Sequence, residues 1–331
     1  MTSRFRALRI DRTDGGIRAA LSPLTLDDLT PGDVVVRVAW SSINYKDALA
    51  VTGAGPILRR FPLVGGIDLA GTVVESADSR FAPGDAVLVC GCGLGETRDG
   101  GFAELARVPA DCIEPVPPGL DPRSAMIIGT AGFTAALALE RLERNGQSPA
   151  LGPLLVTGAT GGVGSFAVAL ASRRGYEVHA LTGKTGAADY LKALGAAEIV
   201  DRHALPRSGK PLERATWGGG IDAVGGEVLA TLLASTRANG NVAAIGLAGG
   251  AKLETTVMPF ILRGVSLIGV NSVDVDRTLR ASIWRRLGAD WRLPDLERIV
   301  AREVALDDVP AACRELLDGR VVGRILVRIE T

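Results

Sequence analysis

The chain has 331 residues, an apolar fraction of 47%, and 37 acidic against 37 basic residues, so its formal net charge is zero. This length favours two domains over one, and the balanced charge is unlike that of a nucleic-acid-binding protein, which needs a basic surplus for phosphate contacts. No stretch approaches the roughly 20 apolar residues that span a bilayer, and the amino-terminal residues lack the apolar region of a secretory signal. We therefore expect a two-domain cytoplasmic protein without nucleic-acid or membrane partners.

The first third of the chain indicates short strands separated by glycine and proline turns. Candidate strands are residues 34–38, 71–75 and 85–89, and Pro-Gly pairs precede the first and the third. β-Branched residues dominate these strands, as expected of pleated, half-buried segments. The pattern predicts a small, mostly antiparallel β domain.

After residue 121 the pattern changes to helices alternating with strands. Residues 122–143 are rich in Ala, Leu and Met, which favour helix. Six candidate strands follow, with helical patterns between several of them, at residues 154–157, 178–181, 198–200, 221–224, 242–245 and 266–270. Such an alternation predicts a doubly wound parallel sheet. The chain then becomes helical and ends in a candidate strand at 323–329, which we expect to return to the first domain.

The most informative segment is a glycine-rich turn after the first of these six strands. It reads Thr157-Gly-Ala-Thr-Gly-Gly-Val-Gly164, and an apolar helix follows. Ala159, Gly161 and Gly164 occupy the glycine positions of the dinucleotide motif G-x-G-x-x-G, where small side chains let the backbone approach a pyrophosphate and the helix directs its N–H groups at that anion. Close packing of a helix on a strand is the alternative. We predict cofactor contacts from four residues of this turn: Thr160, Gly161, Gly162 and Val163.

The end of the second strand indicates which dinucleotide binds. A site that prefers NAD usually has Asp or Glu about 20 residues after the turn, whereas this strand ends in Thr182-Gly183-Lys184, without a carboxylate. Lys184 and the hydroxyl groups of Thr182 and Thr185 can bind a 2′-phosphate, and Arg202 is a second candidate cation. An ordinary solvated surface charge is the alternative for each of these cations. We predict NADPH as the cofactor.

Several motifs together resemble the zinc-free, quinone-oxidoreductase-like branch of the medium-chain dehydrogenase/reductase superfamily, and two are similar to its acryloyl-CoA reductase subfamily. The resemblance extends from about residue 5 to the carboxyl terminus. The branch is carried by Trp40-Ser-Ser-Ile-Asn-Tyr-Lys-Asp-Ala48, Gly65-Gly-Ile-Asp-Leu-Ala-Gly71, Ile127-Ile-Gly-Thr-Ala-Gly-Phe-Thr-Ala135 and the glycine turn, and the subfamily by Gly246-Leu-Ala-Gly-Gly250 and Thr256-Val-Met-Pro-Phe-Ile-Leu-Arg263.

The resemblance implies an α/β fold and an activity. A GroES-like substrate domain at residues 1–125 is completed by a returning segment at 273–331, and a Rossmann NADPH-binding domain at 126–272 is inserted between them. The implied protein is a homodimer that reduces the carbon–carbon double bond of acryloyl-CoA to give propanoyl-CoA.

The residues at the family's zinc positions predict that no metal is bound. Zinc members carry a ligand Cys near the position of Asn44 and a His-Glu pair where this chain reads Ile67-Asp68. Asn44 and Ile67 supply neither thiolate nor imidazole. The cysteines are too widely spaced for a structural zinc lobe and are typical of reduced thiols in a cytoplasmic protein; they are Cys90, Cys92, Cys112 and Cys313.

Without a metal, conjugate reduction of an activated alkene suits the site better than reduction of an alcohol-type carbonyl. Hydride goes to the β carbon, and the resulting enolate needs a hydrogen-bond donor and then a proton at the α carbon. Tyr45 is the first catalytic candidate, because its hydroxyl can donate to oxygen or orient the cofactor; whether it or a water donates the proton stays open. Asp68 is the second, and its alternative is a structural carboxylate paired with Lys46 or Arg98.

The remaining cofactor contacts follow from the resemblance alone: Thr130, Thr134, Leu247, Ile261 and Ser272. By residue type alone, Leu247 and Ile261 would be core residues. Two other functions stay open, a reductase of quinones or free enones with the same hydride chemistry and a catalytically silent NADPH-binding protein.

Overall fold

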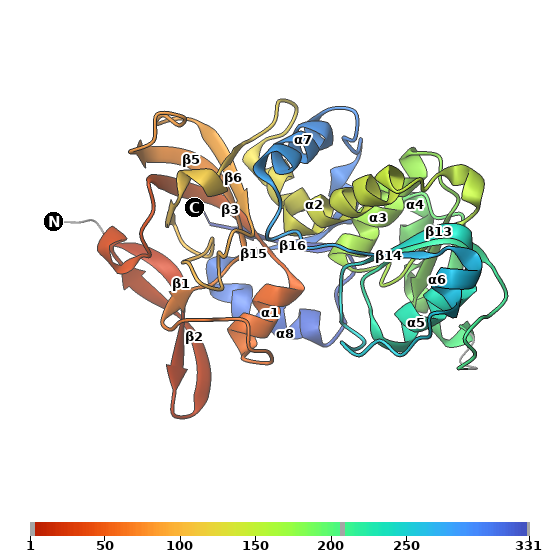
Figure 1. Cartoon of the computed structure of the whole chain (residues 1–331). Helices are drawn as coiled ribbons and strands as arrows, with labels where there is room; N and C mark the ends of the chain where they lie inside the picture. Colours follow the sequence, from red (N-terminus) through yellow and green to blue (C-terminus); the bar gives the residue numbers. More distant parts are fainter. Residues whose placement is uncertain (1–3, 206–208, 330–331) are drawn as a thin grey trace. The chain divides into compact units, whose positions relative to one another are not determined.

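The computed structural model describes residues 4–205 and 209–329. The chain forms two compact units (Figure 1), one made of residues 1–130 and 273–331 and the other of residues 131–272. The second unit is therefore inserted into the sequence of the first.

The first unit contains two β-sheets. The smaller has the order β2-β1-β4, formed by β1 (Phe5–Thr13), β2 (Gly16–Leu24) and β4 (Leu63–Val64). The larger has the order β15-β16-β3-β5-β6-β8, with β7 beside β3, and all its pairs are antiparallel except β15 with β16. Its strands are β3 (Val34–Ile43), β5 (Asp68–Ser76), β6 (Ala86–Cys90), β7 (Leu105–Val108), β8 (Glu114–Pro115), β15 (Val300–Ala305) and β16 (Arg324–Arg328). The expected mostly antiparallel β architecture is confirmed.

The hairpin of β1 and β2 lies outside the strands expected from the sequence. The two strands pair from Phe5 with Leu24 to Thr13 with Gly16, so Asp14 and Gly15 form the turn. Asp-Gly between two strands is among the strongest short-range hairpin signals, and the positive φ of this turn, 111°, is at the next residue, Gly16.

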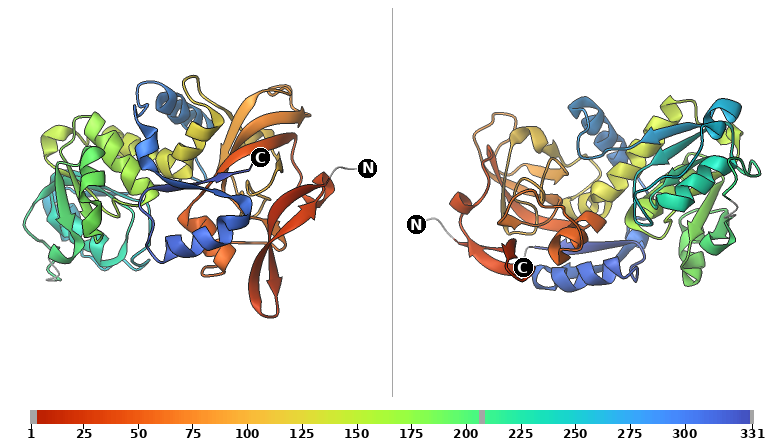
Figure 2. Two further views of the ribbon diagram at one scale, coloured as in Figure 1. Left: turned by 180° about the vertical axis from the view of Figure 1, so that it is seen from behind. Right: turned by 60° about the horizontal axis from the view of Figure 1, so that its bottom comes forward.

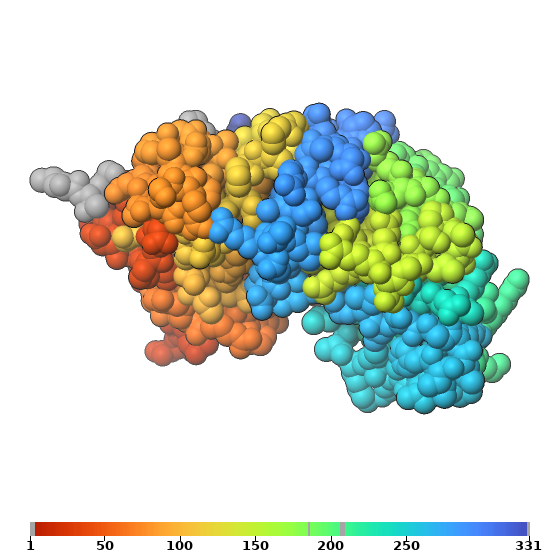
Figure 3. All heavy atoms as spheres, turned by 45° about the horizontal axis from the view of Figure 1, so that its top comes forward, coloured from red at the N-terminus to blue at the C-terminus, as the bar shows by residue number. Residues whose placement is uncertain are grey.

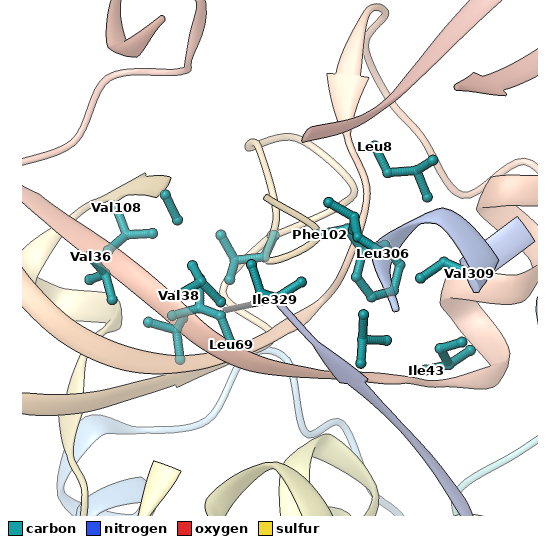
Figure 4. Packing of buried hydrophobic residues seen from close by; sticks show 14 of the residues in the cluster. Leu8, Val36, Val38, Ile43, Leu69, Phe102, Val108, Leu306, Val309 and Ile329 are labelled. Atoms are coloured by element: carbon teal, nitrogen blue, oxygen red, sulfur yellow. The ribbon is translucent and has the colours of Figure 1, made fainter. Parts of the chain in front are cut away.

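The core of the first unit is shared by residues from both ends of the chain. Val36 and Val38 of β3 and Leu69 of β5 pack in one cluster with Val309 and Ile329 from the last segment (Figure 4). Val309 begins α8 (Val309–Leu317), which packs against α1 (Tyr45–Thr52). The last segment therefore completes this core rather than covering it.

The boundary between the units falls inside α2 (Pro122–Arg144), which is kinked at Gly129, where φ is 48° and ψ is −158°. By length and composition α2 could cross a membrane, but 83% of its most apolar 18-residue stretch is buried inside the protein. It is a core helix in two halves.

The second unit is a parallel sheet with helices on both faces (Figure 2). Its six strands have the order β11-β10-β9-β12-β13-β14, and every pair is parallel. In chain order this is 3-2-1-4-5-6, the doubly wound arrangement that binds dinucleotides at the carboxyl ends of the strands. The strands are β9 (Leu154–Val156), β10 (Val178–Thr182), β11 (Glu198–Asp201), β12 (Trp217–Asp222), β13 (Thr236–Ala244) and β14 (Ser266–Gly269), and the helices between them include α3 (Gly162–Arg173), α4 (Ala188–Ala193), α5 (Gly226–Ser235) and α6 (Met258–Arg263). The expected doubly wound sheet is confirmed.

Candidate cofactor site and active site

The glycine turn connects β9 to α3 and has the geometry of an anion cradle. A Cβ on Gly164 would lie 2.2 Å from the carbonyl oxygen of Gly158, so only glycine lets the first turn of the helix approach the loop this closely. A Cβ on Gly161 would meet only the loop's own backbone, the Gly158 oxygen at 3.4 Å. Gly161 caps α3, and the first N–H groups of a helix have no acceptor within it. The turn therefore fits a pyrophosphate.

The cradle is held by contacts on three sides. The Ala159 N–H donates to the Leu181 carbonyl of β10 at 3.2 Å. On the β12 side, the Thr157 hydroxyl donates to Oδ1 of the buried Asp222 at 2.6 Å. On the α4 side, the Tyr190 hydroxyl donates to the hydroxyl of Ser165 at 2.7 Å. None of these side chains was expected to matter from the sequence, because each acts on the turn rather than on a ligand.

The end of β10 brings two cations to one place. A Cβ on Gly183 would lie 2.5 Å from Nε of Arg202, so the guanidinium group passes directly over this glycine. Lys184 follows, and its backbone N–H donates to the Thr182 hydroxyl at 3.0 Å. Burial lowers the pKa of the Lys184 side-chain amine. Asp201 stands beside Thr182 in the ladder, but its Oδ1 accepts the His203 N–H at 2.9 Å. The arrangement suits a phosphate at this strand end.

Most of the expected cofactor residues lie at one edge of the parallel sheet. Thr160, Gly161, Gly162 and Val163 follow β9, Thr182, Gly183 and Lys184 close β10, Arg202 follows β11, Leu247 follows β13, and Ser272 follows β14. Because parallel strands end at the same edge, these residues share it. Leu247 is 59% exposed, contrary to its interpretation as a core residue.

Thr134 lies toward the same edge, whereas Ile261 does not follow a strand end. Arg141 of α2 donates to the carbonyl of Gly269, at the end of β14, while Asn145 donates to Ser266, at its start. The helix thus runs antiparallel to β14, and Thr134 lies about 16 Å before Asn145 along the helix axis. Ile261 is on α6 and is 71% exposed, so the core interpretation is wrong for it as well.

In the first unit, Asp68 is enclosed in a polar network. Its side chain has no exposed surface, and its carboxylate accepts from the Ser42 hydroxyl at 2.8 Å, the Asn44 amide at 2.8 Å and the Thr130 hydroxyl at 2.6 Å. The Thr130 N–H donates to both of its oxygens, at 3.0 and 3.1 Å. Asp68 and Thr130, expected as separate contacts, are direct partners.

The cation of this network is Arg324 of β16, which is 2% exposed and lies 3.5 Å from Asp68. Its guanidinium group donates to the Ser42 hydroxyl at 2.5 Å and to Oδ1 of Asn44 at 2.8 Å. Burial lowers the pKa of this arginine. The expected partners of Asp68 are wrong: Lys46 pairs instead with Glu96 at 2.7 Å. The sequence could not identify Arg324 as the partner of Asp68, because the two residues lie far apart along the chain.

Gly129 is required for this packing. A Cβ there would lie 2.6 Å from Arg324, 2.6 Å from Asp68 and 2.9 Å from Ser42. The kink in α2 is therefore set by the network as well as by the positive φ of this residue. The glycine at this position in the 127–135 motif was the signal available in the sequence.

Asp47 is a second buried carboxyl beside the network. It accepts from the Asn44 N–H and from the Ile67 N–H, both at 2.8 Å, and is 1% exposed. Burial, together with the nearby charge of Asp68, raises the pKa of Asp47 to about 7. Two carboxyl groups share one cation here, which makes the second proton hard to remove.

Tyr45 is the first residue of α1, directly after Asn44, which caps this helix. The capping box of Asn44 and Asp47 fixes the first turn of the helix. Tyr45 itself is 44% exposed. Asp68 and Arg324 both bond to the side chain of Asn44. The network therefore fixes the residue directly before the exposed Tyr45.

The positions of the zinc ligands are occupied by other groups. The Asn44 amide belongs to the buried network, and the Ile67 backbone donates to Asp47. Among residues 4–205 and 209–329, no three His, Cys, Asp or Glu side chains are grouped to hold a metal ion.

The two units and their sites define a class of protein, the dehydrogenases and reductases that combine a GroES-like β domain with a nucleotide-binding Rossmann domain. Residues 30–118 match the family model described as an alcohol dehydrogenase GroES-like domain, and residues 162–288 match that of a zinc-binding dehydrogenase. The chain belongs to the medium-chain dehydrogenase/reductase superfamily.

Two curated relatives cover nearly the whole chain. One is the probable acrylyl-CoA reductase AcuI of Escherichia coli, 49% identical over 98% of this chain and 100% of that protein. The other is the putative quinone oxidoreductase YhfP of Bacillus subtilis, 46% identical over 99% of this chain and 100% of that protein.

Solved structures agree with the fold. The E. coli protein YhdH with bound NADPH is 48% identical and has a TM-score of 0.95, covering 98% of this chain and 100% of its own. The B. subtilis protein yhfP with NAD bound is 46% identical and has a TM-score of 0.96, covering 99% of this chain and 100% of its own.

Proposed function

We propose that this protein reduces the carbon–carbon double bond of acryloyl-CoA to propanoyl-CoA with NADPH. The observation that carries the proposal is the cationic end of β10, where Arg202 lies over Gly183 and Lys184 follows. This end lies beside a glycine turn in a chain with a full-length relative named as a probable acrylyl-CoA reductase.

NADPH, when bound, supplies a hydride to the β carbon of the substrate. On this proposal the N–H groups around Gly161 and Gly162 hold the pyrophosphate, and Lys184 and Arg202 hold the 2′-phosphate. The other residues at this edge, Thr134, Leu247 and Ser272, flank the same nucleotide. Thr130 is not among these residues on this proposal, because its hydroxyl donates to Asp68 and holds that carboxylate in the buried network.

Tyr45 is the proposed group that contacts the substrate or the nicotinamide. Support comes from the exposure of its side chain and from its position in the first turn of α1, which the capping box of Asn44 and Asp47 fixes. A phenol hydroxyl can donate a hydrogen bond to the developing enolate oxygen, which is where negative charge appears when hydride reaches the β carbon. A proton at the α carbon then completes the reduction.

Asp68 is proposed as a positioning residue and not as a proton donor. Both of its oxygens are engaged by Ser42, Asn44 and Thr130, and its side chain has no exposed surface. A carboxylate so enclosed cannot reach a substrate without losing these bonds, each of which is costly to break in a buried site. Its role is to hold Asn44 and therefore Tyr45.

The experiment is a comparison of NADPH oxidation by the purified protein with acryloyl-CoA, crotonyl-CoA and a benzoquinone. We expect the highest kcat/KM with acryloyl-CoA. Rapid quinone turnover without thioester activity would instead favour the quinone reductase, an alternative that the name of the B. subtilis relative supports. Tight NADPH binding without turnover of any of the three would point to a silent binding protein.

We also propose a cytoplasmic homodimer. β14 ends the parallel sheet, so its outer side is an unpaired edge within the described part of the chain. On α6, Ile261 and Leu262 are exposed, and the segment around them is part of the surface in Figure 3. An open strand edge beside exposed apolar side chains suits pairing with a second copy across a two-fold axis. Sedimentation of the wild type and of Ile261→Glu tests this, and a wild-type monomer would refute it.

A further inference from the structure

The loop after β6 holds Cys92 in an uncommon backbone conformation. Gly91, Cys92 and Gly93 all have positive φ, at 76°, 53° and 80°. Two of these positions are glycines, but Cys92 carries a side chain and is one of the few residues other than glycine held this way. Such conformations persist only where the surrounding structure enforces them, and they cluster at functional sites.

A second thiol lies beside Cys92. The Cys92 thiol donates to the backbone carbonyl of Cys112, with 4.0 Å between sulfur and oxygen, so the two cysteines are neighbours in the fold. Both side chains are partly exposed, whereas Cys90 and Cys313 are buried. The pair therefore differs in access from the other two cysteines.

The groups around the pair favour the thiolate of Cys92. The neighbouring Cys112 side chain and then the charges of Arg280 and Arg98 lower the pKa of Cys92 to about 7, against burial and the charge of Glu114. The same contact raises the pKa of Cys112. Arg280 is held in place, 4% exposed, by its bond to the Cys90 carbonyl at 2.8 Å.

We propose that Cys92 and Cys112 form a reversible oxidation site for hydroperoxides, with Cys92 as the attacking thiol and Cys112 as the resolving thiol. The Cys92 sulfur attacks the terminal oxygen of the hydroperoxide, an S–O bond forms, and the O–O bond breaks to release an alcohol or water after protonation. The Cys112 sulfur then attacks the sulfur of Cys92 and expels the oxygen as water. The two cysteine sulfurs are oxidised, and the peroxide is reduced.

The product is a disulfide that ties the loop after β6 to the segment before β8. This loop adjoins the buried network, because Cys90 at the end of β6 pairs with Asp68 in the ladder. Oxidation therefore constrains the chain at Cys92, two residues after Cys90, the neighbour of Asp68 in the sheet. Cytoplasmic disulfides of this kind are usually transient.

The test uses the full-length, reduced protein and hydrogen peroxide near stoichiometric amount. Peptide mapping without reductant should find a Cys92–Cys112 disulfide that dithiothreitol reverses, with Cys90 and Cys313 still free. The initial rate should rise about tenfold between pH 6 and pH 8, as the thiolate of Cys92 forms.

Two variants separate the roles of the thiols. In Cys112→Ser, oxidation should stop at a sulfenic acid on Cys92, trapped by dimedone, because the resolving thiol is absent. In Cys92→Ser, Cys112 should stay unmodified. Equal oxidation of Cys90 and Cys313 in protein with native circular dichroism, or a rate independent of pH, would overturn the proposal.

Discussion

The carboxyl edge of the parallel sheet and the buried network of Asp68 are both built around charged side chains, but they use charge in opposite ways. Lys184 and Arg202 stand at a strand end beside an open glycine turn. Asp68 and Arg324 are 0% and 2% exposed, and other protein groups engage them. Charge in the first region lies at the strand ends, where we propose that the nucleotide binds, and charge in the second organises the fold.

The difference predicts that substitutions in the two regions change different quantities. A side chain that serves a ligand can be removed with little loss of stability, whereas removing one partner of a buried ion pair leaves an uncompensated charge. The five substitutions below test this separation.

The largest effect is expected for Arg324→Met. Loss of the guanidinium group leaves Asp68 buried without its cation, and such changes lower the free energy of unfolding by about 3–5 kcal/mol. Urea denaturation measures the loss. The matched control is Arg328→Met, an exposed arginine of the same strand, for which we expect a change within about 0.5 kcal/mol. Equal effects of the two changes would contradict a special role for the buried pair.

A pH dependence is expected from Asp47. Because its pKa is about 7 in the folded chain and 3.8 in the reference state, the native protein keeps a proton that the unfolded chain releases. Its contribution to stability is therefore complete below pH 3.8 and is lost as the pH rises toward 7. Between pH 5 and pH 8 the loss is about 3 kcal/mol, from 1.36 kcal/mol per unit.

Asp47→Asn removes this titration, so the difference in unfolding free energy between wild type and variant should change between pH 5 and pH 8 in favour of the variant. Urea denaturation at both values measures it. Asp27→Asn, at an exposed position, is the control and should show no such change. A constant difference for Asp47→Asn would mean that the carboxyl titrates as it does in the unfolded chain.

At the sheet edge, Lys184→Ala and Arg202→Ala should weaken NADPH binding and leave NADH binding nearly unchanged. A charged hydrogen bond contributes about 1.5–3 kcal/mol, which corresponds to a tenfold to hundredfold higher Kd for each change. Calorimetric titration with both nucleotides measures it, and Lys192→Ala on the exposed side of α4 is the control. Equal losses for both nucleotides would exclude a 2′-phosphate contact.

The same contrast explains what the sequence predicts and what it does not. The six strands and the glycine turn could be predicted because their signals lie within a few residues of one another. The network could not, because Arg324 and Ser42 are 282 residues apart and nothing local marks them as partners. Residue type alone would place Leu247 and Ile261 in a core, whereas both are exposed, since an apolar side chain does not reveal whether a second surface covers it.

The smallest effect is expected for Tyr45→Phe. Only a hydroxyl is removed, and α1 keeps its capping box, so stability should stay unchanged. If the hydroxyl donates to the enolate oxygen, kcat with acryloyl-CoA should fall about tenfold, the lower end of what one hydrogen bond to a charged oxygen contributes in the transition state. Tyr176→Phe is the control, because its hydroxyl donates to the Gln147 carbonyl at 3.1 Å within the second unit, and its loss should lower stability while kcat is kept. An unchanged kcat in Tyr45→Phe would assign the exposed ring to substrate positioning alone and leave water as the proton source.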